Sequence, residues 1–138
     1  MNVTLSPDYK PSSDEDFMNP LMLEYFRQKL LGWRGELLNE SNVTLQHLQE
    51  SSGLESDIAD RASTETERAL ELRTRDRARK LISKIDSALK RIDIGDYGYC
   101  EETHEPIGLS RLEARPIATL SIEAQERHER MERTHRDD

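Results

Sequence analysis

The chain's only cysteine, Cys100, lies in a stretch whose spacing matches a zinc ribbon: DYGYCEETHEPIGLSRLEARPIATLSIEAQ, residues 96–125. Such a ribbon has the form Cys-x2-Cys, about seventeen residues, Cys-x2-Cys, and binds zinc through four thiolates. Starting at Cys100, its four positions hold Cys100, Thr103, Ser121 and Ala124. Three thiolates are therefore missing while the spacing is retained.

Two histidines lie close to the vacant positions. His104 is one residue beyond the second position and His128 is one helical turn beyond the fourth, and zinc accepts mixed Cys and His ligands. A fourth ligand would still be absent, so we predict a zinc-independent unit whose core is closed by packing. Cys100 then behaves as a small buried hydrophobe, and no neighbour in the sequence obviously lowers its pKa. The predicted core residues are Tyr97, Tyr99, Ile107, Leu109, Leu112, Ile117, Leu120 and Ile122.

A second group with chemical potential is Asp57, Asp60 and Ala62 in the segment ESDIADRAS. One interpretation is structural: Asp60 caps a helix and Asp57 solvates a turn. The other is that the carboxylates are presented to a partner at the end of a rigid arm. A two-Asp turn is weak evidence for a preformed metal site.

The elements that must position these residues are mostly helical. Apolar residues at three- and four-residue steps predict one helix from Pro20 to about Ser51 and another from about Arg61 to Ile94, stopped by Gly95. The short linker SGLESDIAD makes antiparallel neighbours the expected geometry. The fold class is therefore mainly α: a long two-helix coiled-coil hairpin, a small zinc-ribbon-like unit without zinc, and a C-terminal helix to about His135.

We predict three parts along the chain: a flexible tail over residues 1–17, the hairpin over 18–94 with its tip at about 52–61, and the globular unit over 95–138. Burial in the hairpin should be strongest around Phe26, Trp33, Ile85 and Leu89. The seam should be weak in the middle, where Thr44 and the stretch Arg75–Arg79 replace large aliphatics, and the far end should be thin and exposed. In the globular unit, HEPIG predicts a turn between short strands or extended segments.

Charge and composition exclude several classes. Only 34% of the 138 residues are hydrophobic and 35% are charged, which disfavours a large enzyme core. The net charge of −8 disfavours specific binding to duplex DNA, although residues 71–91 carry eight basic and three acidic side chains. That basic helix is either a solvated face or a docking surface. With no signal peptide and no membrane-spanning segment, we expect a cytoplasmic protein.

These strings together resemble the DksA/TraR family of bacterial transcription factors. The resemblance rests on LELRTRDRARKLISKIDSALKRI, GDYGYCE, IGLSRLEARP and DIADRA, with support from FRQKLLGWRGELLNE, and covers about residues 18–130. It implies a non-enzymatic, monomeric factor that binds RNA polymerase directly and makes no sequence-specific contact with DNA. The hairpin would enter the secondary channel and, with ppGpp, modulate open complexes at ribosomal RNA and amino-acid biosynthesis promoters.

The resemblance also implies roles for individual residues. Asp57, Asp60 and Ala62 match the family's polymerase-contacting tip. Lys84, Arg111 and Arg115 match basic residues around ppGpp, with Leu81 nearby. Where the family usually has a lysine on the last helix, this chain has Gln125, which predicts a weaker response to ppGpp.

Two other classes remain open from the sequence. A general coiled-coil adaptor would self-associate through its hairpin. A transcript-cleavage factor would use the same channel to bring an acidic tip to a second magnesium ion.

Overall fold

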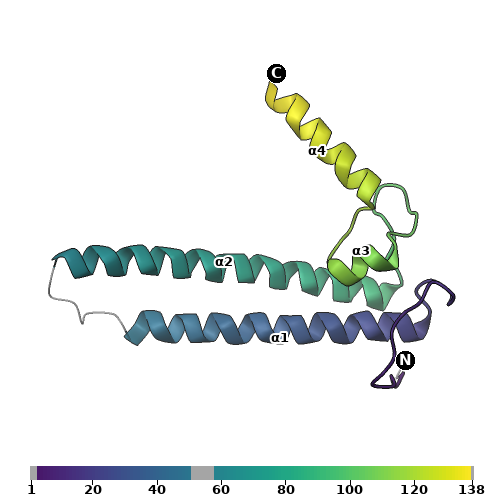
Figure 1. The fold of residues 1–138 in the computed structure, drawn as a ribbon, viewed down its shortest axis with the longest axis horizontal. Coiled ribbons are helices and arrows are strands. Elements are labelled where there is room, and N and C mark those ends of the chain that lie inside the picture. The colour runs from purple at the N-terminus through teal and green to yellow at the C-terminus, as the bar shows by residue number, and fades with distance from the viewer. Residues whose placement is uncertain (1–2, 51–57, 138) are drawn as a thin grey trace. The chain divides into compact units, whose positions relative to one another are not determined.

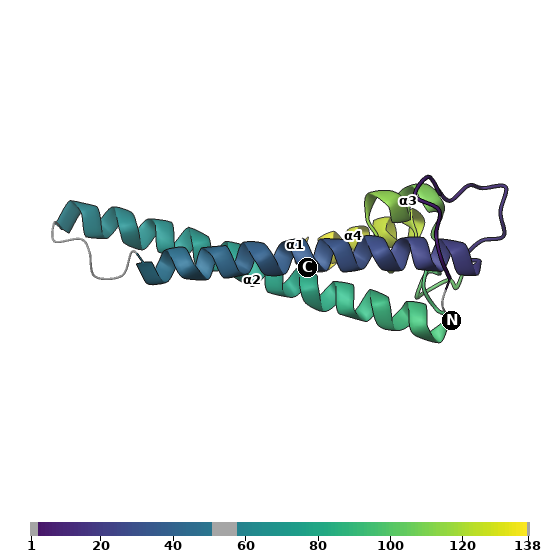
Figure 2. The same ribbon diagram turned by 90° about the horizontal axis from the view of Figure 1, so that it is seen from below.

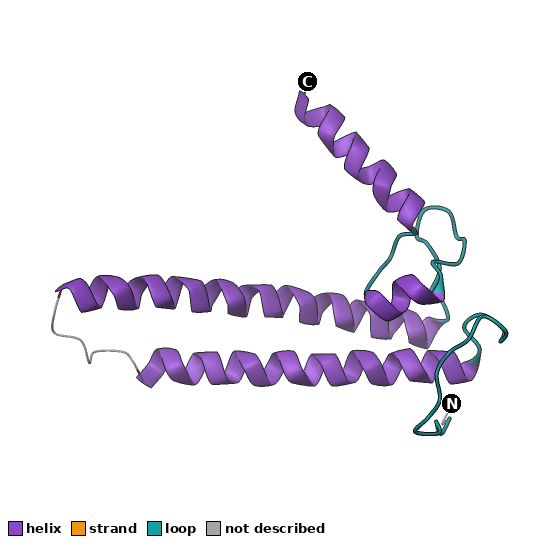
Figure 3. Cartoon of the chain, in the orientation of Figure 1, coloured by secondary structure: helices purple, strands orange, loops and turns teal. Residues whose placement is uncertain are grey.

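The computed structural model describes residues 3–50 and 58–137, which form four helices and no extended strand (Figure 1 and Figure 3). The contacts divide the chain into two compact units. The ribbon unit comprises residues 1–30 and 87–138, and the arm unit comprises residues 31–86. The helices are α1 (Pro20–Glu50), α2 (Ile58–Ile94), α3 (Leu109–Ala114) and α4 (Ile122–Asp137). The mainly helical fold predicted from the sequence is confirmed.

In the arm unit, residues 31–50 of α1 and 58–86 of α2 run antiparallel beside each other (Figure 1 and Figure 2). Two polar contacts connect them: Arg34 Nε donates to Asp86 Oδ1 at 2.7 Å, and His47 Nδ1 lies 2.7 Å from Glu71 Oε1. The hairpin geometry expected from the short linker is therefore present.

Burial in the arm unit decreases towards the tip. Ile85 is fully buried, and the last buried side chains on the two helices are Leu37 on α1 and Ala78 on α2, within the residues whose side chains are described. Trp33 is only half-buried, so its expected place among the most buried residues is wrong. The predicted thin seam is confirmed, because beyond Leu37 and Ala78 the two helices share little apolar area.

The helix ends follow from capping chemistry. Asn19 Oδ1 accepts hydrogen bonds from the backbone N–H groups of Leu21 and Met22, as an N-cap does, and α1 begins at Pro20. At the end of α2, Gly95 has φ 84°, and the next N–H, of Asp96, donates to the carbonyl of Arg91 at 2.9 Å. Both predicted boundaries are confirmed.

The start of α2 differs from the prediction. The helix begins at Ile58 rather than near Arg61. The backbone of Asp60 therefore lies inside the first turn and not at the N-cap position. The expected capping role of its side chain falls outside the described residues.

The ribbon unit is built around aromatic packing between helix and loop. Phe26 of α1 and Tyr97 after α2 are almost fully buried, with ring centroids 5.6 Å apart. The other side chains with at most 1% exposure in this unit are Met22, Leu30, Ala88, Cys100, Leu112 and Ala124.

The predicted core is confirmed in part. Ile107 and Ile117 are buried as expected, but Tyr99 is 36% exposed and Ile122 is 52% exposed. Leu89 at the end of α2, expected among the most buried residues, is half-buried. The turn at HEPIG contains a single bridge between Tyr99 and Pro106 in place of paired strands. In the described residues the loop is held by individual hydrogen bonds instead of a ladder.

The N-terminal segment contacts the ribbon unit at several points. The Tyr9 hydroxyl donates to Glu15 at 2.9 Å, and the Tyr9 ring packs edge-on against Tyr25. Phe17 packs edge-on against Tyr99. The flexibility expected for this segment stays a prediction. No helix in the described parts of the chain is long and apolar enough to cross a lipid bilayer.

Met18 and Gly98 make a close contact that allows a stability test. Gly98 has φ 94°, and a Cβ at this position would lie 2.8 Å from Met18 Cγ. We predict that Gly98→Ala lowers the free energy of unfolding by about 2–4 kcal/mol, through backbone strain and overpacking. Gly95→Ala is the matched control, since Gly95 also has positive φ but no atom near its Cβ; it should cost about 1 kcal/mol. Urea unfolding followed by circular dichroism measures both, and equal losses would contradict the proposed packing effect.

Candidate functional site

The vacated ribbon is organised around the sulfur of Cys100. Cys100 is 1% exposed, and the hydrogen-bond donors that act on the pKa of its thiol are the Thr103 hydroxyl and the backbone N–H groups of Ser121, Thr103 and Glu102. The predicted burial of this thiol is confirmed. The loop and the start of α4 thus converge on one sulfur atom, where a four-thiolate ribbon would hold a metal.

These hydrogen bonds change the acidity of the thiol. Burial raises the pKa of Cys100, but the donors from Thr103, Ser121 and Glu102 together outweigh burial and lower the pKa from 9.0 to about 6. The expectation that no neighbour in the sequence lowers this pKa is therefore wrong, because Thr103 and Glu102 contribute. The residue types around Cys100 did not indicate this effect, because the donors are mostly backbone N–H groups and one of them belongs to Ser121.

The three other ribbon positions have acquired local structural roles. Ser121 Oγ accepts the Ala124 N–H at 3.2 Å and so caps α4. Ala124 is fully buried. Thr103 Oγ1 accepts the Glu105 N–H at 3.3 Å.

The residues at these positions do not fit zinc. Ala124 has no donor atom, and the two hydroxyls are poor ligands engaged in hydrogen bonds. Neither histidine compensates: His104 is exposed with φ 62°, and His128 Nε2 pairs with Glu102 Oε1. Among the described residues, no group of three or more His, Cys, Asp or Glu side chains could hold a metal ion.

The predicted ppGpp residues divide into two pairs, one in each unit. In the arm unit, Leu81 is half-buried and Lys84 is exposed, one helical turn apart on α2. In the ribbon unit, Arg111 and Arg115 lie on and just after α3. Gln125, also in the ribbon unit, is half-buried and donates from Nε2 to Glu129 Oε1 at 3.3 Å.

The two arginines have different surroundings. Arg111 Nε donates to the backbone carbonyl of Leu120 at 2.8 Å, so part of this guanidinium pins the loop before α4. Arg115 is exposed and makes no ion pair with any residue in the described ranges. Arg115 is the more available of the two for an anionic ligand.

The tip residues lie largely outside the part of the chain that the structure describes. Asp57 is not among the described residues, and the Asp60 side chain is likewise not described, although its backbone belongs to α2. Ala62 is exposed.

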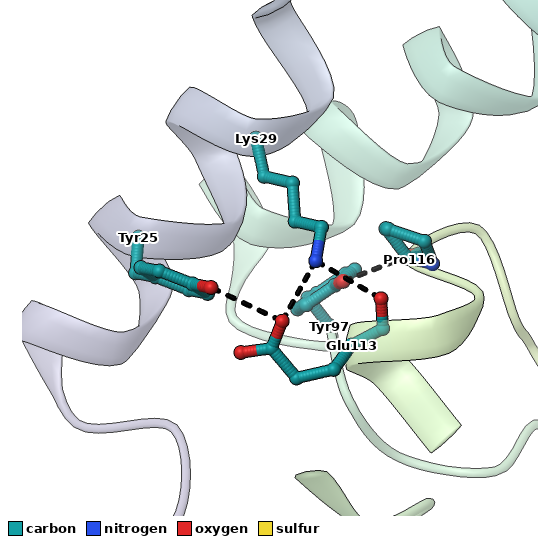
Figure 4. A network of polar contacts seen from close by, with 5 residues as sticks. All are labelled: Tyr25, Lys29, Tyr97, Glu113 and Pro116. Carbon is teal, nitrogen blue, oxygen red and sulfur yellow. Dashed lines mark hydrogen bonds and ion pairs between the residues drawn. The ribbon is translucent and has the colours of Figure 1, made fainter. Parts of the chain in front are cut away.

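A polar network that the sequence did not reveal joins α1 to α3 within the ribbon unit (Figure 4). Lys29 Nζ donates to the Glu113 carboxylate at 2.7 Å and to its backbone carbonyl at 2.9 Å. The Tyr25 hydroxyl donates to the same carboxylate at 3.1 Å. Burial, followed by this contact with Glu113, raises the pKa of Tyr25. Nearby, the Tyr97 hydroxyl donates to the carbonyl of Pro116 at 2.8 Å.

Sequence patterns could not reveal this network, because Glu113 is more than eighty residues from Tyr25 and Lys29. The residue types are also common on protein surfaces. Lys29 and Glu113 are each about one-third exposed, and an ion pair at such a position contributes only about 0–1 kcal/mol. Its consequence is therefore mainly geometric: it sets how α3 sits on α1.

The comparisons with known proteins follow the same division of the chain. Residues 22–92 match the family model of the DnaK suppressor protein DksA, N-terminal domain, and residues 95–130 match that of the prokaryotic dksA/traR C4-type zinc finger. The second match is to a four-cysteine finger, and this chain departs from it because only Cys100 remains of the four cysteines.

Two named relatives and one solved structure are similar to this chain over most of its length. The chain is 70% identical over 131 residues to the RNA polymerase-binding transcription factor DksA of Caulobacter vibrioides, covering 95% of this chain and 92% of the relative. It is 45% identical over 115 residues to the factor of the same name from Escherichia coli K12, covering 83% and 76%. The solved structure of transcription factor DksA2 from Pseudomonas aeruginosa superimposes with a TM-score of 0.80 at 45% identity, covering 90% and 94%. This chain belongs to the DksA family.

The Cys100 environment predicts a pH dependence of stability. Because the folded pKa of about 6 lies below the unfolded value of 9.0, the unfolded chain binds more protons between these values. The stabilisation is complete above pH 9 and is lost as the pH falls through 6, with a slope of at most about 1.4 kcal/mol per pH unit. Urea unfolding of wild type and Cys100→Ala should therefore give curves that diverge as pH rises from 6 to 9. Parallel curves over this range would contradict the assignment.

Proposed function

We propose that this protein is a non-enzymatic transcription regulator that binds bacterial RNA polymerase directly. The observation that carries the proposal is the 70% identity, over nearly the full length of both chains, to a factor named for RNA polymerase binding. The fold also supports the proposal, because it presents two long antiparallel helices.

The arm is proposed to enter the secondary channel of the polymerase, as the family resemblance implies. Support comes from its exposure: beyond Leu37 and Ala78 no described side chain of the arm unit is buried. A segment with so few internal contacts gains little from its own packing, so its side chains are available to a surrounding partner. Asp57, Asp60 and Ala62 would then reach towards the catalytic centre, and open complexes at ribosomal RNA and amino-acid promoters would be modulated.

The effector is proposed to be ppGpp, bound through Leu81, Lys84, Arg111 and Arg115. The exposure of Lys84 and Arg115 supports this, since both can meet phosphate groups without first breaking an ion pair. Gln125 in place of a lysine removes one attractive charge, so a weak response to ppGpp is expected.

The tip assignment is tested by removing charge while keeping shape. Asp57→Asn with Asp60→Asn should reduce inhibition of a ribosomal RNA promoter by about tenfold or more, because two charge-assisted contacts are lost. Binding of the protein to polymerase should persist, since the rest of the arm is intact.

Glu65→Gln with Glu67→Gln is the matched control for the tip variant, because both residues are exposed on the same helix. It removes the same charge and should leave inhibition at the wild-type level. In vitro transcription with purified polymerase measures both, and full inhibition by the tip variant would rule out the charge-based role.

The unit is also proposed to need no zinc. Protein purified without added metal should contain far less than one zinc per chain by elemental analysis, and a chelator should leave its unfolding temperature unchanged, because three ribbon positions lack a thiolate.

The triple variant Thr103→Cys, Ser121→Cys, Ala124→Cys is the positive control for the zinc prediction. It restores the four thiolates at the retained spacing and should bind one zinc and become sensitive to chelators. Stoichiometric zinc in the wild-type protein would contradict the proposal.

A further inference from the structure

The short helix α3 cannot hold its own position. It has six residues, and its N-cap residue Gly108 offers no side-chain hydrogen bond. A helix of this length is not stable alone, so its placement depends on contacts with the rest of the ribbon unit. One of these is the fully buried side chain of Leu112.

Polar tethers restrain the end of α3 from which Arg115 emerges. Lys29 holds the carboxylate and the carbonyl of Glu113, two residues before Arg115. Tyr97 holds the carbonyl of Pro116, one residue after it. Figure 4 shows the two tethers side by side, with Lys29 reaching from α1 and Tyr97 from the segment after α2. The backbone that carries Arg115 is thus restrained on both sides.

The same contacts also adjust the local charge. Glu113 is two residues from Arg115 and would repel an approaching polyanion if it were unpaired. Lys29 places a positive charge 2.7 Å from that carboxylate and also neutralises a carbonyl near the C-terminal end of the helix. An anion that approaches Arg115 is therefore repelled less by Glu113, because Lys29 compensates the charge of that carboxylate.

We propose that Lys29 is a positioning residue for the effector, and that by holding Glu113 it sets the orientation of Arg115 towards the phosphate groups of ppGpp. This inference rests on the proposed function, in which Arg115 contacts ppGpp. Lys29 does not touch the ligand itself; it acts through the end of α3. The sequence similarity to the family assigns it no such role.

The test is a titration of ppGpp in transcription assays with full-length protein and purified polymerase. Lys29→Met should raise the ppGpp concentration for half-maximal effect at least about fivefold, the lower end of usual couplings between sites. Inhibition without ppGpp should stay at the wild-type level. Lys29→Arg keeps a cation on Glu113 and should respond as wild type, whereas Lys10→Met removes an exposed positive charge elsewhere in the ribbon unit and should change nothing.

A double variant separates position from charge. Lys29→Met with Glu113→Gln removes both charges but leaves the tether broken, so the response should remain weakened. Recovery to the wild-type response would overturn the positioning role. If Lys29→Met fails to fold, Tyr97→Phe removes only the hydroxyl that restrains Pro116, and it should weaken the response while preserving inhibition without ppGpp.

The outcomes also distinguish this inference from the proposed function. A wild-type protein with no response to ppGpp would overturn the effector assignment and the inference with it. A wild-type protein that responds, together with Lys29→Met and Tyr97→Phe variants that respond equally well, would overturn the inference alone.

Discussion

The contact between Phe26 and Tyr97 connects the first long helix to the loop that follows the second. Both rings are almost fully buried, and the Tyr97 hydroxyl is satisfied by a backbone carbonyl. A small unit with a single cysteine has no internal disulfide and relies on burial of this kind, at roughly 1.5–3 kcal/mol per large apolar side chain. The ends of α1 and α2 therefore serve as the hydrophobic support on which the ribbon folds.

The ribbon keeps its loop although three of its four ligand positions lack a thiolate. Each of these three positions satisfies a local requirement: Ser121 caps α4, Ala124 fills the core and Thr103 closes a turn. The remaining sulfur accepts several hydrogen bonds, which favour its ionised form. The thiol is only 1% exposed, so its lowered pKa alone does not make it reactive. A thiolate must also be accessible to its target to act as a nucleophile.

The two units differ in how much they depend on their own packing. Among the described residues, most of the buried large apolar side chains belong to the ribbon unit, whereas no described side chain of the arm unit is buried past Leu37 and Ala78. Low local stability is expected where buried apolar contacts are sparse. An arm of this kind suits a role inside a partner, because the partner's surface can supply the contacts that the arm lacks.

Much of the fold could be predicted because it is encoded locally. Apolar periodicity, the Asn19 cap, the Gly95 stop and the Ser121 cap each act within a few residues, so the long helices were predicted within a few residues of their observed ends. The spacing of the four ribbon positions likewise sufficed to predict the missing ligands. The short helix α3 was missed, because six residues contain too little periodicity to identify.

What only the tertiary structure decided depends on residues distant in sequence. The pKa of Cys100 is lowered partly by a backbone N–H of Ser121, which no local pattern could indicate. The Lys29 contact with Glu113 spans more than eighty residues and involves side chains that are common on any surface. Sequence by itself determined the helices, their ends and the vacant metal positions; folding decided which polar groups meet, because hydrogen bonds and ion pairs depend on distances that only the packed chain defines.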